Sequence, residues 1–178
     1  MDTITIKDLS FKPYISETDL QESVKQVAQK INQDYQGKSP LFLGVLNGSF
    51  MFIGDLMKSI NIDCLISFVK LASYEGTESS GKVSELIGLN ENIEDKDIIL
   101  IEDIIDTGNT LEKLHQILEE KKPKSIKIAT LLYKPEAYKK SYKIDYVGKE
   151  IPNAFVLGYG LDYDGYGRNL SSIYVLKD

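Results

Sequence analysis

Apolar positions along this chain follow two different periods. Across residues 19–35 they recur at helical spacing, which predicts an amphipathic helix, and Gly37 and Pro40 end the pattern. Elsewhere, short continuous apolar runs predict buried strands, which alternate with further helical stretches. We expect strands at 41–46, 62–71, 98–101 and 126–132, and helices at 50–60 and 111–121.

This order of elements indicates an α/β fold. Strand–helix–strand repeats give a parallel sheet with helices on both faces, and ligands bind at the carboxyl ends of its strands. The C-terminal third is richer in Tyr and Gly, with short strand-like pieces near Ile144, Phe155 and Ile173. A length of 178 residues favours a single domain with a substantial core.

Composition and charge exclude several classes of function. The formal net charge of −6 argues against a nucleic-acid groove as the main function. A single cysteine, Cys64, excludes an intrachain disulfide and a Cys-rich zinc site. The N-terminal stretch has no signal-peptide pattern, and no apolar run approaches membrane-spanning length. We therefore expect a cytoplasmic protein with neither a nucleic-acid nor a membrane partner.

The most informative motif follows the apolar run 98–101. Two carboxylates stand where we expect that strand to end, a third lies in the turn, and small and hydroxyl residues lead into the next helix. The N–H groups at the start of a helix suit a phosphate, and paired carboxylates suit hydrated Mg²⁺ or sugar hydroxyls. Ordinary loop residues with a threonine cap remain the alternative. The motif consists of Glu102, Asp103, Asp106, Thr107, Gly108, Asn109 and Thr110.

A polar segment between residues 74 and 92 has three interpretations. Gly76, Gly81 and Lys82 nearly match a Walker A loop, but Val83 stands where the Mg²⁺-binding Ser or Thr is needed. A simple hairpin tip is the second interpretation. We favour the third, a mobile lid, because long polar loops in compact domains are usually functional or disordered.

Two unique residues complete the candidates. Arg168 is the only arginine, and its planar guanidinium suits two oxygens of a phosphate, although a structural bridge to an aspartate is equally compatible. His115 is the only histidine and lies at the edge of the apolar face of a predicted helix, so we expect no catalytic role for it. Without a second histidine or a well-placed serine, a hydrolase triad has no support.

Over almost its full length the sequence resembles the hypoxanthine–guanine phosphoribosyltransferase family, a branch of the type I phosphoribosyltransferases. Segment 45–52 resembles the pyrophosphate-binding loop, and Ser73 and Tyr74 begin a segment similar to the catalytic flap. Residues 102–110 resemble the motif for phosphoribosyl pyrophosphate (PRPP). Residues 131–134 and 147–163 resemble the purine-binding hood, which distinguishes this branch from others.

The resemblance implies a type I phosphoribosyltransferase fold, with a central, mainly parallel sheet flanked by helices. It implies one domain (1–178) with a core at about 18–135, a hood formed by the N-terminal segment and about 136–178, and a flap at about 73–92. The implied reaction is Mg²⁺-dependent transfer of the 5-phosphoribosyl group from PRPP to N9 of a 6-oxopurine, hypoxanthine or guanine, in purine salvage. Members of the family are usually homodimers or homotetramers.

The resemblance also assigns a role to each candidate residue. Asp106 would hold the proton at purine N7, and Glu102 and Asp103 would bind the ribose hydroxyls and hydrated Mg²⁺, with Asp162 at a second Mg²⁺. The remaining roles fall to three groups: Thr107, Gly108, Asn109 and Thr110 for the 5′-phosphate; Asn47, Gly48 and Arg168 for pyrophosphate; and Lys134 (at O6), Phe155 (stacking) and Val156 (backbone) for the purine.

Two departures and two alternatives stay open at this point. Asn47 stands where the family commonly carries Lys, and Asn109 stands where Lys is frequent, so each site lacks a charge. A phosphoribosyltransferase for another base shares the PRPP motif, although Lys134 argues against it. A regulator that kept the fold but lost activity is the second alternative, although its catalytic carboxylates would be expected to change.

Overall fold

The computed structural model of the chain describes residues 2–74 and 83–177. The elements are as follows. The helices are α1 (Glu17–Asp34), α2 (Phe50–Ser59) and α3 (Asn109–Glu119); the strands are β1 (Ile4–Ile6), β2 (Leu9–Ile15), β3 (Leu41–Val45), β4 (Leu65–Tyr74), β5 (Val83–Ile87), β6 (Asp97–Ile105), β7 (Ser125–Tyr133), β8 (Tyr146–Glu150), β9 (Val156–Leu157) and β10 (Ile173–Leu176).

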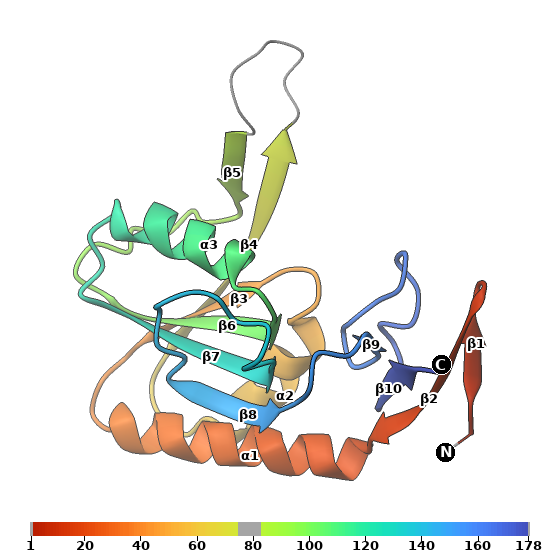
Figure 1. The fold of residues 1–178 in the computed structure, drawn as a ribbon. Coiled ribbons are helices and arrows are strands. Elements are labelled where there is room, and N and C mark those ends of the chain that lie inside the picture. Colours follow the sequence, from red (N-terminus) through yellow and green to blue (C-terminus); the bar gives the residue numbers. More distant parts are fainter. Residues whose placement is uncertain (1, 75–82, 178) are drawn as a thin grey trace.

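A six-stranded sheet of order β5-β4-β3-β6-β7-β8 forms the centre of the molecule (Figure 1). All neighbours in it are parallel except β5, which runs antiparallel to β4. Helices α1 and α2 pack against one face, where Ile99 and Ile101 of β6 are buried, and α3 packs against the other with Ile98 and Leu100. This alternation along a fully buried strand explains the continuous apolar run, and it confirms the α/β fold class.

A second, four-stranded sheet of order β1-β2-β10-β9 stands beside the first and brings the two ends of the chain together (Figure 1). Its strands are antiparallel and enclose a small cluster around Phe11, Leu157 and Tyr174. The sequence interpretation placed no strand before residue 19. Strand β2 contains Pro13, which weakens a strand pattern, and its partner β10 lies at the far end of the chain.

Two strands differ from their expected bounds by more than one residue. The strand expected at 62–71 forms instead at Leu65–Tyr74, because residues 62–64 belong to the turn that follows α2. Strand β6 continues to Ile105, so Glu102 and Asp103 lie within the strand instead of following it. The ladder to β7 explains this difference, because Glu102 pairs with Thr130 in register.

The polar segment 74–92 is described only at its two sides. Strands β4 and β5 form an antiparallel pair in which Tyr74 lies opposite Val83. Residues 75–82, which include most of the expected flap and the Walker-like Gly76–Lys82 stretch, lie outside the described residues. Because strand β5 begins at Val83, where a Walker A loop requires a helix, the NTPase interpretation is excluded.

Among the described residues, no helix combines the length and the apolar character needed to cross a membrane.

Candidate active site

A hollow of about 340 Å³ lies at the carboxyl ends of β3 and β6, where ligands bind in parallel α/β sheets. It is bounded by the segment after β3, the end of β6 and the first residues of α3. It brings together most of the residues that the sequence motif identified. Its lining residues are Val45, Leu46, Gly48, Glu102, Asp103, Ile104, Ile105, Asp106, Thr107, Gly108, Asn109, Thr110 and Leu111.

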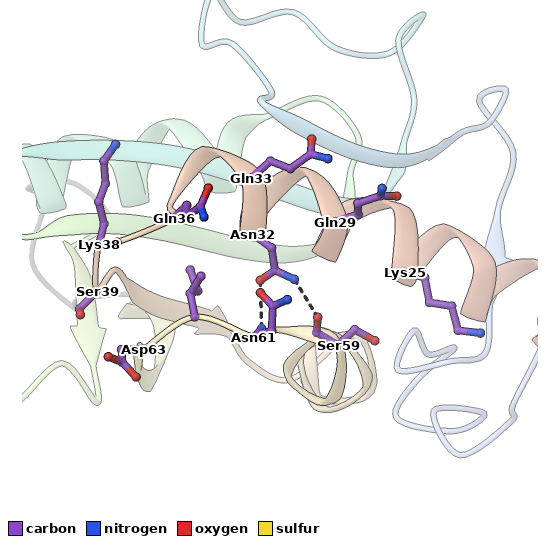
Figure 2. Close-up of a pocket in the computed structure, with 12 residues that line it drawn as sticks. Lys25, Gln29, Asn32, Gln33, Gln36, Lys38, Ser39, Ser59, Asn61 and Asp63 are labelled. Atoms are coloured by element: carbon purple, nitrogen blue, oxygen red, sulfur yellow. Dashed lines mark hydrogen bonds between the residues drawn. The ribbon is translucent and has the colours of Figure 1, made fainter.

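A larger hollow, of about 710 Å³, lies at the opposite edge of the sheet (Figure 2). It is lined by polar side chains of α1 and by the segments that lead into β3 and β4. Asn32 joins its two sides, since the side-chain amide donates to the Ser59 carbonyl and accepts from the Asn61 N–H, both at 3.0 Å. This position is the amino-terminal edge of the strands, and Asp63 is the one carboxylate in the lining. We therefore assign the chemistry to the smaller hollow.

The 107–110 turn is shaped for close approach of a ligand to the backbone. Gly108 has φ +83°, in the left-handed region, and α3 begins at the next residue. A Cβ at Gly108 would lie 2.6 Å from Cε2 of Tyr138, so the connection after β7 closes over this turn. The first N–H groups of a helix lack intrahelical partners, and here the first residues of α3 line the hollow beside the turn.

Glu102 and Asp103 are adjacent carboxylates at the floor of the hollow. Glu102 is only 6% exposed, and burial together with the Asp103 charge holds its pKa well above the ordinary value. Burial also raises the pKa of Asp103 to about 6, although two backbone N–H groups and the Arg168 charge act in the opposite direction. A buried carboxylate beside a partly buried one favours a cation or hydroxyl donors next to the pair.

The donor set fits Mg²⁺ only in part. Within the described ranges, no group of three His, Cys, Asp or Glu side chains could hold a metal by itself. Mg²⁺ commonly uses one or two carboxylates and completes its shell with water and substrate phosphates. Glu102 and Asp103 therefore suit a magnesium ion that arrives with a phosphorylated ligand.

The segment after β3, the Asp103 side chain and the C-terminal region meet at Gly48. A Cβ on this residue would lie 1.6 Å from Oδ2 of Asp103, and a Cβ on Gly160 would lie 2.0 Å from the Gly48 carbonyl oxygen. Asn47, at the preceding position, is exposed, and the Leu46–Asn47 peptide bond is cis. The glycines thus allow the segment after β3 to pass between β6 and the C-terminal region.

Arg168 lies at this junction and makes the aspartate bridge that the sequence left open. Its Nη2 is 2.6 Å from Oδ1 of Asp162, and its Nη1 donates to the Gly160 carbonyl at 2.7 Å. The charges of Arg168 and Asp162 both act on the pKa of Asp103, in opposite directions. The structure therefore brings Arg168, Asp162 and Asp103 near segment 45–52, which resembles the pyrophosphate-binding loop.

Lys134 and Asp106 form an ion pair at the other side of the hollow. The Lys134 ammonium donates to Oδ2 of Asp106 at 2.7 Å, and the lysine is 6% exposed. The backbone supports this pairing, because the Lys134 N–H donates to the Ile105 carbonyl at 3.0 Å. The sequence suggested a role for each residue but did not predict their contact.

Val156 begins strand β9 of the second sheet, Phe155 directly precedes it, and both lie outside the lining of the hollow. The Phe155 ring is 44% exposed and lies against the rings of Phe11 and Tyr163, at centroid distances of 6.1 and 5.9 Å. Val156 is buried and pairs with Val175. Phe155 therefore presents an open aromatic face, whereas Val156 offers only its backbone.

His115 lies outside the hollow, as expected for a structural residue. Its ring packs on Tyr142 with a centroid distance of 4.3 Å, and Nδ1 is 3.4 Å from the Glu119 carboxylate.

Comparisons with known proteins agree with this geometry. The family described as "Phosphoribosyl transferase domain" matches residues 16–164. The chain is 44% identical to the hypoxanthine-guanine phosphoribosyltransferase of Staphylococcus aureus strain Mu50, over 92% of both chains. It is 46% identical to that of Streptococcus pyogenes serotype M3, over 92% of this chain and 91% of the relative. A crystal structure of a Bacillus anthracis hypoxanthine-guanine phosphoribosyltransferase superposes with a TM-score of 0.86 at 38% identity, covering 96% of this chain and 100% of the other.

Proposed function

The chain belongs to the phosphoribosyl transferase domain family, and we propose that it transfers the 5-phosphoribosyl group of PRPP to N9 of hypoxanthine or guanine. The products are the purine nucleoside monophosphate and pyrophosphate, which makes the chain a purine salvage enzyme. The curated relatives at 44% and 46% identity support this reaction class.

The contact between Lys134 and Asp106 is the observation that supports the proposed specificity for 6-oxopurines. The buried ammonium of Lys134 can donate to a purine O6, and the Asp106 carboxylate can accept the proton at N7. A 6-aminopurine would place donor hydrogens against the lysine, which is unfavourable because a buried donor is left unpaired. The pair therefore favours 6-oxopurines.

The other residues serve the bond that breaks. Departure of pyrophosphate leaves positive charge on the ribose, as in glycosyl transfer generally. Glu102 and Asp103 would hold the ribose hydroxyls and the hydration shell of a magnesium ion, and Asp162 would lie at a second magnesium ion. When bound, Mg²⁺ supplies positive charge that stabilises the leaving pyrophosphate. Asn47, Gly48 and Arg168 bind the pyrophosphate.

The remaining contacts fix the two ends of the nucleotide. The backbone of the 107–110 turn and the hydroxyls of Thr107 and Thr110 hold the 5′-phosphate, with Asn109 at the start of α3. Phe155 stacks on the purine ring through its exposed face, and the Val156 backbone meets the edge of the base.

A direct assay tests this function. The purified chain is incubated with PRPP, Mg²⁺ and one of hypoxanthine, guanine, xanthine or adenine, and nucleotide and pyrophosphate are quantified. We expect turnover with hypoxanthine or guanine and little with adenine. Turnover with adenine alone would refute the base assignment, and no turnover with any base would support a regulator that kept the fold.

We also propose a homodimer or homotetramer in the cytoplasm. Strand β5 pairs with residues 70–74 of β4, and the remaining part of β4 exposes the apolar side chains of Leu65, Ile66 and Phe68. Exposed apolar side chains on a sheet edge favour self-association. Highly charged PRPP does not cross membranes, so an enzyme that consumes it works where it is made. Light scattering after gel filtration measures the oligomer.

A further inference from the structure

The 107–110 turn has no cationic side chain of its own, since its residues are Thr107, Gly108, Asn109 and Thr110. Its backbone and hydroxyl groups donate hydrogen bonds to a phosphate, but a phosphate dianion held in a partly buried site also favours a positive charge nearby. The net charge of the chain is −6, so the general field of the protein does not supply that charge.

The connection between β7 and β8 brings one lysine to this turn. A Cβ on Gly108 would lie 2.8 Å from Cγ of Lys140, so the aliphatic part of the lysine crosses directly over the glycine. The backbone fixes this position, because the Lys139 N–H donates to the Thr107 carbonyl at 3.3 Å. The Lys140 side chain is only 20% exposed and is thus held against the turn.

The Lys140 ammonium ends beside the first turn of α3. It donates to Oε2 of Glu112 at 2.7 Å, and the Glu112 N–H in turn donates to the Gly108 carbonyl at 2.9 Å. An uncompensated Glu112 carboxylate at this place would repel a phosphate. Lys140 therefore neutralises Glu112 and stands within one helical turn of the N–H groups that would bind the anion.

From this placement we propose that Lys140 is the phosphate-binding cation of the site, paired with Glu112 until the 5′-phosphate of the substrate arrives. The inference rests on the proposed function and adds a binding residue to it. When the phosphate binds, the Lys140 ammonium lies between the phosphate and the Glu112 carboxylate. The ammonium attracts the phosphate, while Glu112 competes with the phosphate for the ammonium.

A purely structural ion pair is the competing explanation, and the two explanations differ in sign at Glu112. If the pair only fastens the connection to α3, Lys140→Met and Glu112→Gln both loosen the turn and both weaken phosphate binding. If Lys140 serves the phosphate, Glu112→Gln releases the ammonium and strengthens binding, whereas Lys140→Met weakens it.

The experiment measures binding of ribose 5-phosphate by calorimetry and the KM values for PRPP and hypoxanthine. We expect Lys140→Met to raise the dissociation constant and the KM for PRPP about five- to tenfold, with the KM for hypoxanthine unchanged. Glu112→Gln should lower both constants about twofold. Lys143→Met, which removes an 84% exposed lysine from the same connection, is the matched control and should change neither.

A rescue variant separates charge from folding. Asn109→Lys combined with Lys140→Met should restore ribose 5-phosphate binding, because it returns a cation to the same turn. Equal losses in Lys140→Met and Glu112→Gln, or unchanged ribose 5-phosphate binding in Lys140→Met, would overturn the inference. A failure of the proposed function would show differently, as a wild-type protein that binds ribose 5-phosphate but transfers no 5-phosphoribosyl group from PRPP to any purine.

Discussion

The Lys134 ammonium lies 2.7 Å from the Asp106 carboxylate, and the two partners differ sharply in exposure. The lysine side chain is 8% exposed and the aspartate side chain 44%. A buried cation with one counter-charge depends on that partner, since removing it leaves an uncompensated charge. The contact therefore couples the residue proposed to recognise the purine O6, Lys134, to the residue proposed to accept the N7 proton, Asp106.

Asp106→Asn should lower kcat about 10²–10⁴-fold and change the KM for PRPP much less. The amide keeps the shape of the side chain but cannot accept the N7 proton. Steady-state kinetics at saturating hypoxanthine and PRPP measure the effect. Asp63→Asn, a change of the same kind at an exposed position, serves as the control. Unchanged turnover would remove Asp106 from the role of base.

Lys134→Met should weaken 6-oxopurine use by about 1.5–3 kcal/mol, the usual range for a charge-assisted hydrogen bond. We expect the loss in the KM for hypoxanthine and not in the KM for PRPP. The exposed Lys143 provides a matched substitution. If PRPP binding falls while hypoxanthine binding is preserved, Lys134 belongs to a phosphate site.

Local patterns predicted the central sheet because the apolar residues of each strand and helix repeat within a short stretch of sequence. They could not predict β2, which is a stable strand only through pairing with β10 at the other end of the chain. The same limit applied to the site. Glu102 and Asp103 are close in sequence, but the packing of Gly48 against Asp103, and of Gly160 against Gly48, depends on the fold. Nothing in the sequence distinguishes Lys140 from the other lysines, so its position over the 107–110 turn could not be predicted.

Gly48→Ala should abolish most activity, because the new methyl group would occupy the position of the Asp103 carboxylate, 1.6 Å from Oδ2. Either the carboxylate or the segment after β3 must move, and both are proposed to bind substrate. Gly54→Ala in α2 is the control, since nothing lies within 4 Å of its added Cβ. This control should be more stable than the wild type by about 0.5–1 kcal/mol. Kinetics and thermal melting of both variants check the prediction.

Arg168→Lys should raise the inhibition constant of pyrophosphate, because a point charge cannot replace a guanidinium that bonds Asp162 and the Gly160 carbonyl together. Asn47→Lys should act in the opposite direction and tighten pyrophosphate binding by roughly 1 kcal/mol, the low end for a partly solvated charge. Product inhibition of the forward reaction measures both. Equal constants for the wild type and Asn47→Lys would show that this side chain does not face pyrophosphate.

Asp103→Asn should stabilise the metal-free protein at neutral pH while it lowers activity. Burial raises the pKa of Asp103 from 3.8 to about 6, so between these values the folded state binds the proton more tightly than the unfolded state. The free energy of unfolding of the wild type therefore falls as pH rises through this window, by on the order of 2–3 kcal/mol. The amide avoids this loss, so the stability advantage of Asp103→Asn should be full above pH 6 and vanish near pH 4.

Urea unfolding in the presence of a chelator measures this difference in stability, with Asp63→Asn as the exposed control. Adding Mg²⁺ and PRPP should stabilise the wild type more than the variant, because only the carboxylate interacts favourably with the ion. A variant that is less stable than the wild type at pH 8 would contradict this prediction and would mean that the Asp103 charge supports the fold.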